Sequence, residues 1–113
     1  MNHHSAASPD LIADIGGTNA RFALVGADRQ IYAEQLMTCA DFPDPSAAIR
    51  CYLAEVAVPP PRQAAIAVAT AIMGDWIQFT NSPWSFSIET TRQALGLERL
   101  LSLIHISEPT RPY

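Results

Sequence analysis

The chain has 113 residues, 49% of them hydrophobic and 16% charged, with a formal net charge of −4 at pH 7. This length allows one domain with a hydrophobic core, and the composition is that of a folded globular protein. The acidic balance argues against a nucleic-acid partner held by bulk electrostatics. No apolar run approaches the roughly 18 residues of a membrane span. We therefore expect neither a nucleic acid nor a membrane as partner.

Two cysteines, Cys39 and Cys51, lie within apolar patterns of the sequence. No signal-peptide pattern precedes them, so we expect free thiols in a reducing, cytoplasmic compartment rather than a disulfide. All seven basic residues are arginine. This absence of lysine bears on which phosphate-binding motifs the chain can form.

The first part of the chain predicts three strands after a flexible, polar start at residues 1–9. Residues 10–15 and 20–25 are apolar runs on either side of a glycine pair, which predicts two strands joined by a tight turn. Residues 30–38 alternate in part between apolar and polar side chains, which predicts a third antiparallel strand. Together they predict a meander.

The remainder predicts two helices and further strands. Asp44-Pro45 is a typical helix start, and prolines 59–61 stop that helix. Residues 64–70 are apolar on both faces, which is typical of a parallel strand covered on both sides. We predict a short strand at 75–79 and, capped by Ser87, a helix at 88–95 that ends at Gly96. The predicted order is βββ-α-β-β-α-β, an α/β domain with a mixed sheet.

The glycine turn has polar residues on both sides. Asp14 precedes Gly16-Gly17, and Thr18 follows. Adjacent glycines can take positive φ and leave N–H groups uncovered, so that these converge on an anion such as phosphate. A P-loop is excluded because the chain has no lysine, and the dinucleotide fingerprint G-x-G-x-x-G is absent. Phosphate would then bind a β-hairpin, with Asp14 placed to organise Mg²⁺ directly or through water. The alternative is a glycine-rich hairpin with an incidental acid.

The stretch LIADIGGTNARFAL resembles the first phosphate motif of the bacterial glucokinase family, within the sugar kinase/actin/Hsp70 superfamily. A second stretch, GDWIQFTNSPWSFSIETTRQALGL, resembles the family's later segment G-D-W-x-x-x-T-N-x-x-W-x-F-S-I followed by a helix. The resemblance covers about residues 10–100 and implies an incomplete actin-like ATPase (ribonuclease H-like) domain. The residues that match the later segment are Asp75, Trp76, Thr80, Asn81, Trp84, Phe86, Ser87 and Ile88.

The resemblance implies a kinase that transfers the γ-phosphoryl group of ATP to the 6-hydroxyl of glucose with Mg²⁺. Asp14 would hold Mg²⁺ through water. Family members often have glycine where this chain has Ala13, a mild departure. The full-length protein would be compatible with a homodimer. The residues expected to contact the ATP phosphates are Ala13, Asp14, Ile15, Gly16, Gly17 and Thr18.

Three further residues could line the sugar side of the cleft, since amides, hydroxyls and an aromatic ring suit a sugar: Asn81, Trp84 and Ser85. The alternative is structural, with Trp84 and Phe86 in the core and Ser87 as a helix cap. Arg21 could pair with an acid on the sheet rather than with phosphate. These alternatives stay open at the level of sequence.

The family's catalytic base, the Asp of an Asn-Asp pair after the L-G helix end, does not occur here. No catalytic residue is therefore predicted within this chain. The final LSLIHISEPTRPY does not resemble the family and looks like a translated sequencing adapter; the alternative is a genuine divergent tail. We expect residues 10–101 to be part of the smaller, N-terminal domain, residues 102–113 to be a non-native or unstructured tail, and the chain itself to be inactive.

Two other functions are compatible with the superfamily. A sugar-responsive regulator would carry a DNA-binding helix-turn-helix before the hairpin, whereas only about nine residues precede the first strand. A purely structural actin-like protein would not need the sugar-loop resemblance at residues 80–88. A glucokinase segment is therefore the favoured interpretation.

Overall fold

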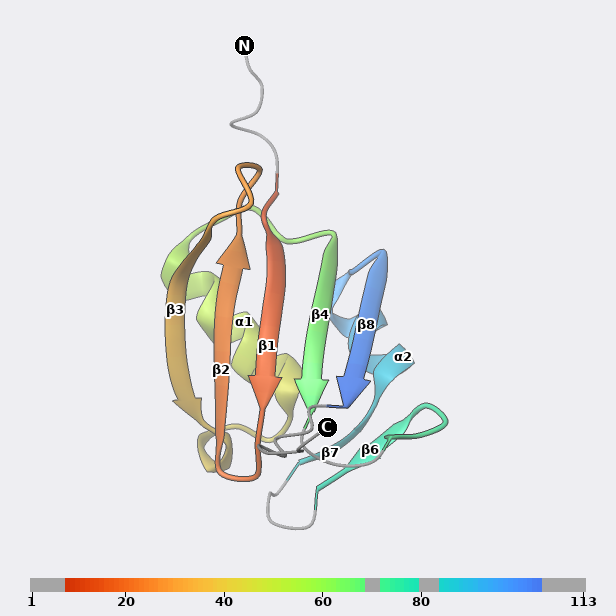
Figure 1. Cartoon of the computed structure of the whole chain (residues 1–113). Coiled ribbons are helices and arrows are strands. Elements are labelled where there is room, and N and C mark those ends of the chain that lie inside the picture. Colours follow the sequence, from red (N-terminus) through yellow and green to blue (C-terminus); the bar gives the residue numbers. More distant parts are fainter. Residues whose placement is uncertain (1–7, 69–71, 80–83, 105–113) are drawn as a thin grey trace, which may run out of the picture.

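A five-stranded sheet forms the body of the molecule (Figure 1). The computed structural model describes residues 8–68, 72–79 and 84–104. In the order β3-β2-β1-β4-β8, the sheet contains β1 (Asp10–Ile15), β2 (Asn19–Val25), β3 (Ile31–Thr38), β4 (Gln63–Val68) and β8 (Arg99–Ile104). The first three strands are antiparallel, whereas β4 is parallel to both β1 and β8. The predicted meander and mixed α/β sheet are confirmed.

Two helices and a second, smaller sheet complete the fold. The helices are α1 (Pro45–Val56) and α2 (Ile88–Leu95), and a short 3-10 helix, η2 (Cys39–Asp41), follows β3. Asp44 caps α1 through a 2.9 Å bond from the Ala47 N–H, as predicted. The smaller sheet pairs β5 (Ile72–Met73), β6 (Trp76–Gln78) and β7 (Ser85–Ser87).

The predicted element order was wrong between β4 and α2. The strand predicted at residues 75–79 is present as β6, but two further short strands that we did not expect, β5 and β7, pair with it in antiparallel orientation. Gly74, at φ 65°, and Asp75 form the turn that joins β5 to β6. The observed order is therefore βββ-α-β-βββ-α-β. Segments of two or three residues are too short for a periodicity of two to identify them from sequence.

Both helices cover the same face of the large sheet (Figure 1), so the expectation that β4 is covered on both sides was wrong. Ile66 and Val68 are buried beneath the helices, whereas Ala65 and Ala67 are only half-buried on the opposite face. That face carries a hollow of about 390 Å³, lined in part by Ala65, Ala67 and Asp14. The apolar pattern of β4 indicates a strand suited to burial on both sides, while the described residues provide helices for one side only.

Tyr52 of α1 forms a hydrogen bond to β3 at a β-bulge. Its buried hydroxyl donates a 2.7 Å hydrogen bond to the Ala33 carbonyl oxygen, and its ring lies 5.5 Å from that of Phe22. Ala33 has a φ of 58°, at a β-bulge where the register between β2 and β3 shifts. Burial, with a smaller contribution from Tyr32, raises the pKa of Tyr52 to about 12.

This pKa predicts a loss of stability at high pH. As the pH rises through 10, the Tyr52 phenol ionises first in the unfolded chain, so the free energy of unfolding falls until the pH passes about 12. Tyr52→Phe should remove this contribution, and at neutral pH should cost about 1 kcal/mol because the bond to Ala33 is lost. Urea unfolding at neutral pH measures the lost hydrogen bond, and urea unfolding between about pH 10 and pH 12 measures the fall in stability. Tyr32→Phe, at a half-exposed tyrosine, is the control and should retain the fall; an unchanged pH profile in Tyr52→Phe would contradict the assignment.

Strand β8 continues to Ile104, so the boundary predicted at residue 101 falls inside the strand. Residues 105–113 lie outside the described part of the chain, and the prediction for them stays a prediction. Within β8, the Ser102 side-chain oxygen is buried and has no hydrogen-bond partner among the described residues. Ser102 is in register with Ile66, a buried residue of the helix-covered face. A hydroxyl therefore occupies a position that favours an apolar side chain.

We expect Ser102→Ala to stabilise the chain by about 1 kcal/mol, because a buried unsatisfied hydroxyl costs about 1–3 kcal/mol and the lost oxygen leaves little empty volume. The measurement is the urea midpoint of the variant against the parent chain. Ser85→Ala, at an exposed serine, is the matched control and should shift stability by less than about 0.5 kcal/mol. A destabilised Ser102→Ala would show that this hydroxyl has a partner in solution.

Candidate functional site

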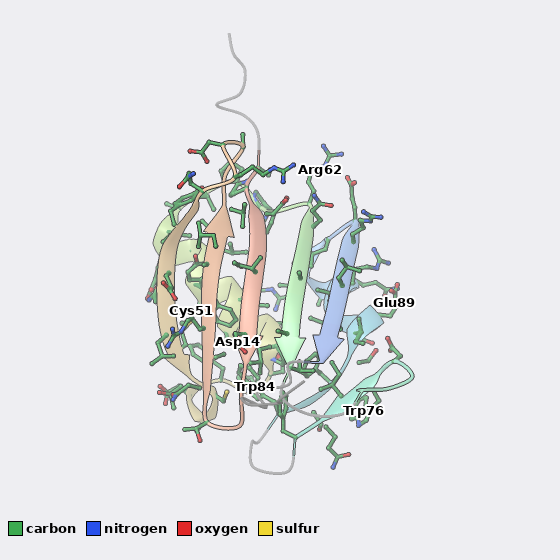
Figure 2. All side chains as sticks on the ribbon, viewed as in Figure 1. Asp14, Cys51, Arg62, Trp76, Trp84 and Glu89 are labelled. Atoms are coloured by element: carbon green, nitrogen blue, oxygen red, sulfur yellow. The ribbon has the colours of Figure 1, made fainter. Side chains whose placement is uncertain are left out.

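The candidate site lies where the parallel strands end. β1, β4 and β8 point in the same direction, and the β1–β2 turn lies at their carboxyl ends (Figure 1). Asp14 is exposed near the end of β1 (Figure 2). This edge is where open α/β sheets generally bind ligands. The fold thus places the predicted phosphate turn and its carboxylate at a favourable edge.

The turn closes through a 2.9 Å hydrogen bond from the Gly16 N–H to the Asn19 carbonyl oxygen. Its glycines do not use the positive φ that glycine allows, because the described glycines with positive φ are Gly74 and Gly96. A Cβ added to Gly16 would make only an ordinary contact, 3.5 Å from the Asn19 oxygen. The exposed Thr18 places a hydroxyl beside the turn. The turn is therefore an open polar backbone loop without left-handed strain.

The turn is also held from the core side by η2. The Cys39 N–H donates to the Thr18 carbonyl oxygen at 2.9 Å, and the Cys39 thiol lies 3.8 Å from the Gly16 carbonyl oxygen. Cys39 is completely buried, whereas Cys51 is half-buried, and no disulfide joins the two thiols. Sequence reasoning did not identify Cys39 as part of the site, because only the strand register brings residues 16 and 39 together.

The charged neighbours of Asp14 lie on the open face of the sheet. Arg21 is opposite Asp14 in the β1–β2 register, and its guanidinium lies 3.4 Å from the Glu34 carboxylate. Arg21 thus pairs with an acid on the sheet, as one of our two interpretations had it. Within the described ranges, no group of three or more His, Cys, Asp or Glu residues could hold a metal ion. A cation at this edge would therefore need oxygens from water or a bound ligand beside Asp14.

The predicted sugar-contacting residues are not gathered at the turn. Trp84 is only 1% exposed, and its indole N–H donates to the Phe42 carbonyl oxygen at 2.9 Å, so it packs as a core residue. Ser85 is exposed and lines a separate hollow of about 330 Å³ with Trp76 and Arg50. Asn81 lies outside the described residues, and its sugar contact stays a prediction.

Asp75 is a capping residue that the sequence interpretation did not assign. Ser87 caps α2 as predicted, accepting the Thr90 N–H at 3.1 Å. The Asp75 main-chain oxygen accepts the Ile88 N–H at 2.8 Å, and its carboxylate accepts the Glu89 N–H at 2.9 Å and the Ser87 hydroxyl. All three leading N–H groups of α2 therefore have protein acceptors, and this helix start is not available to an anion.

Comparison of the fold with solved structures identifies the class of protein. A solved glucokinase from an Antarctic psychrotroph superposes with a TM-score of 0.79 and 37% identity, covering 86% of this chain and 32% of that chain. A ROK family glucokinase from Streptomyces griseus, solved with glucose and AMPPNP, shares the fold at a TM-score of 0.58 and 17% identity, covering 84% of this chain and 33% of that one. The chain therefore has the fold of part of an actin-like sugar kinase.

Comparison of the sequence with known proteins identifies the family within that class. A family model for glucokinase matches residues 11–105. The glucokinase of Neisseria meningitidis is 51% identical over 98 residues, which are 87% of this chain and 30% of that protein. The glucokinase of Helicobacter acinonychis is 56% identical over 96 residues, 82% of this chain and 29% of that protein. The chain belongs to the glucokinase family and spans about 30% of the length of the curated relatives it matches.

Two further findings bear on the sequence predictions. The family match, like strand β8, extends beyond residue 101. Among the helices of the described residues, none is long and apolar enough to cross a membrane.

Proposed function

We propose that this chain is the segment of a glucokinase that contacts the phosphates of ATP. The full-length protein would transfer the γ-phosphoryl group to the 6-hydroxyl of glucose. The observation that carries this proposal is the β1–β2 turn in a glucokinase-family fold. There, the exposed Asp14 and Thr18 flank the Gly17 N–H, which has no protein acceptor among the described residues. Open backbone donors of this kind suit a phosphate.

The residues present also fit Mg²⁺ bound with the nucleotide. Mg²⁺ keeps several waters and is usually held by one or two carboxylates plus substrate phosphates, so the single carboxylate of Asp14 is sufficient. Bound Mg²⁺ would neutralise charge on the phosphates. Gly17 and Thr18 would orient the phosphates through backbone and hydroxyl donors. Catalysis of phosphoryl transfer consists mostly of such positioning and charge neutralisation.

The sugar-responsive regulator is not favoured. Relatives that are 51% and 56% identical to this chain are both named glucokinases.

The identity of residues 102–113 is a separate part of the proposal. Ser102 is the first residue of the predicted tail, and its buried hydroxyl has no hydrogen-bond partner among the described residues. This poor fit supports a non-native sequence at that point. Strand β8 still continues to Ile104. The proposal is therefore that the side chains from residue 102 onward are not native ones, and it does not say that the strand ends there.

A titration of the ¹⁵N-labelled chain with Mg-ATP tests nucleotide binding. We expect the amide signals of Gly17 and Thr18 to shift, and chelation of Mg²⁺ with EDTA to weaken the binding. Asp14→Asn keeps the size of the side chain but removes its charge, and should reduce the effect of Mg²⁺. Shifts confined to residues far from the turn, or no shift at saturating nucleotide, would contradict the proposal.

A further inference from the structure

We infer that Cys39 is a positioning residue for the phosphate turn, and that its hydrogen bonds aim the Gly17 N–H away from the core toward bound phosphate. This inference rests on the proposed function of the turn. Cys39 would not touch the nucleotide, because its side chain is completely buried. It would act through the main chain of residues 16–18.

The two hydrogen bonds from Cys39 set the direction of the turn carbonyls. The thiol is 3.8 Å from the Gly16 carbonyl oxygen, and the backbone N–H is 2.9 Å from the Thr18 carbonyl oxygen. Both oxygens are therefore directed toward η2 and the core. A phosphate approaching from solvent does not meet these two negative dipole ends, which would otherwise repel it.

Peptide geometry links the Gly16 carbonyl to the donor. In a trans peptide, the C=O of one residue and the N–H of the next point in opposite directions, and the described chain contains no cis peptide. Because the Gly16 C=O points at Cys39, the Gly17 N–H points away from it. This N–H has no protein acceptor among the described residues, so it is available to a ligand. The Cys39 thiol thereby fixes the orientation of a candidate phosphate donor.

The position of Cys39 follows from the strand register. Thr38, the last residue of β3, pairs with Asn19 at the start of β2, so the residue after Thr38 lies beneath the β1–β2 turn. The buried site requires a small side chain that also donates a hydrogen bond. Alanine would fit but lacks a donor, whereas serine retains one.

Mg-ATP titrations of four ¹⁵N-labelled proteins test the inference: the parent chain, Cys39→Ala, Cys39→Ser and Cys51→Ala. We expect Cys39→Ala to weaken Mg-ATP binding about fivefold, the effect of one lost hydrogen bond of about 1 kcal/mol. Cys39→Ser should bind Mg-ATP with an affinity between those of the parent chain and Cys39→Ala, because its hydroxyl also donates but is carried on a shorter bond than the thiol. Cys51→Ala makes the same chemical change in α1, away from the turn, and should bind as the parent does.

A second readout needs no nucleotide. ¹⁵N relaxation should show a lower order parameter for the Gly17 amide in Cys39→Ala than in the parent chain, with the serine variant in between. Equal order parameters and equal Mg-ATP affinities in Cys39→Ala and the parent would overturn the role of Cys39 while leaving the proposed function intact. A parent chain that shows no Mg-ATP binding, with the Gly17 amide equally ordered in both proteins, would overturn both.

Discussion

The 113-residue chain is expected to form glucose 6-phosphate from glucose and Mg-ATP at least about 100-fold more slowly than a full-length glucokinase. The family's Asn-Asp pair does not occur in the sequence, and loss of a general base typically costs about 10²–10⁴-fold. The matched segment also represents only 30% of the Neisseria meningitidis relative. Groups that position both substrates would therefore be missing, which adds to the loss.

A coupled assay of glucose 6-phosphate formation measures this directly, with the Neisseria meningitidis glucokinase as the positive control. Turnover by the chain within tenfold of that enzyme would contradict the prediction. It would also require a base within residues 1–113, and His105 and Glu108 would then be the first residues to substitute.

Asp14→Ala is expected to lower kcat by at least about 100-fold in a complete enzyme while leaving the fold intact. A suitable enzyme is a chimera in which residues 10–101 of this chain replace the matching segment of the Neisseria meningitidis glucokinase. Asp14 is exposed, so its role in packing is small, and a carboxylate beside a phosphate turn should act through Mg²⁺. The measurement is kcat as a function of Mg²⁺ concentration.

Asp10→Ala in the same chimera is the matched control. Asp10 is an aspartate of the same strand, at the end remote from the turn, where its carboxylate accepts a 3.2 Å hydrogen bond from Gln63. This substitution should leave kcat within about twofold. Parent-level turnover of Asp14→Ala at limiting Mg²⁺ would rule out a role for Asp14 in metal binding.

The elements predicted correctly from sequence are those with a strong local signal. Paired apolar runs on either side of the glycine turn specify the β1–β2 hairpin, and Asp44 and Ser87 are effective N-caps that define the starts of α1 and α2. Gly96, at φ 68°, ends α2 as predicted because the left-handed conformation favours glycine. Local chemistry is sufficient at each of these positions.

The features that were missed or left open depend on contacts between distant residues. The core position of Trp84, one of our two interpretations, becomes clear only from its burial and from its hydrogen bond to Phe42, 42 residues earlier in the chain. The bracing of the turn by Cys39 spans 23 residues and depends on the β2–β3 register. Glycine at the turn suggested positive φ, but the observed backbone does not use it. Neither composition nor periodicity carries this information. The position of the site along the chain could therefore be predicted from sequence, but the contacts that hold the turn in place could not.

Glucose-dependent turnover by the unsubstituted chimera tests most directly whether residues 10–101 form a working part of a glucokinase. We expect glucose 6-phosphate formation with a kcat/KM within about tenfold of the Neisseria meningitidis enzyme, because this chain is 51% identical to that enzyme over the 98 residues that match. A chimera that is folded by circular dichroism and thermal unfolding, yet forms no glucose 6-phosphate above background, would contradict the proposed function.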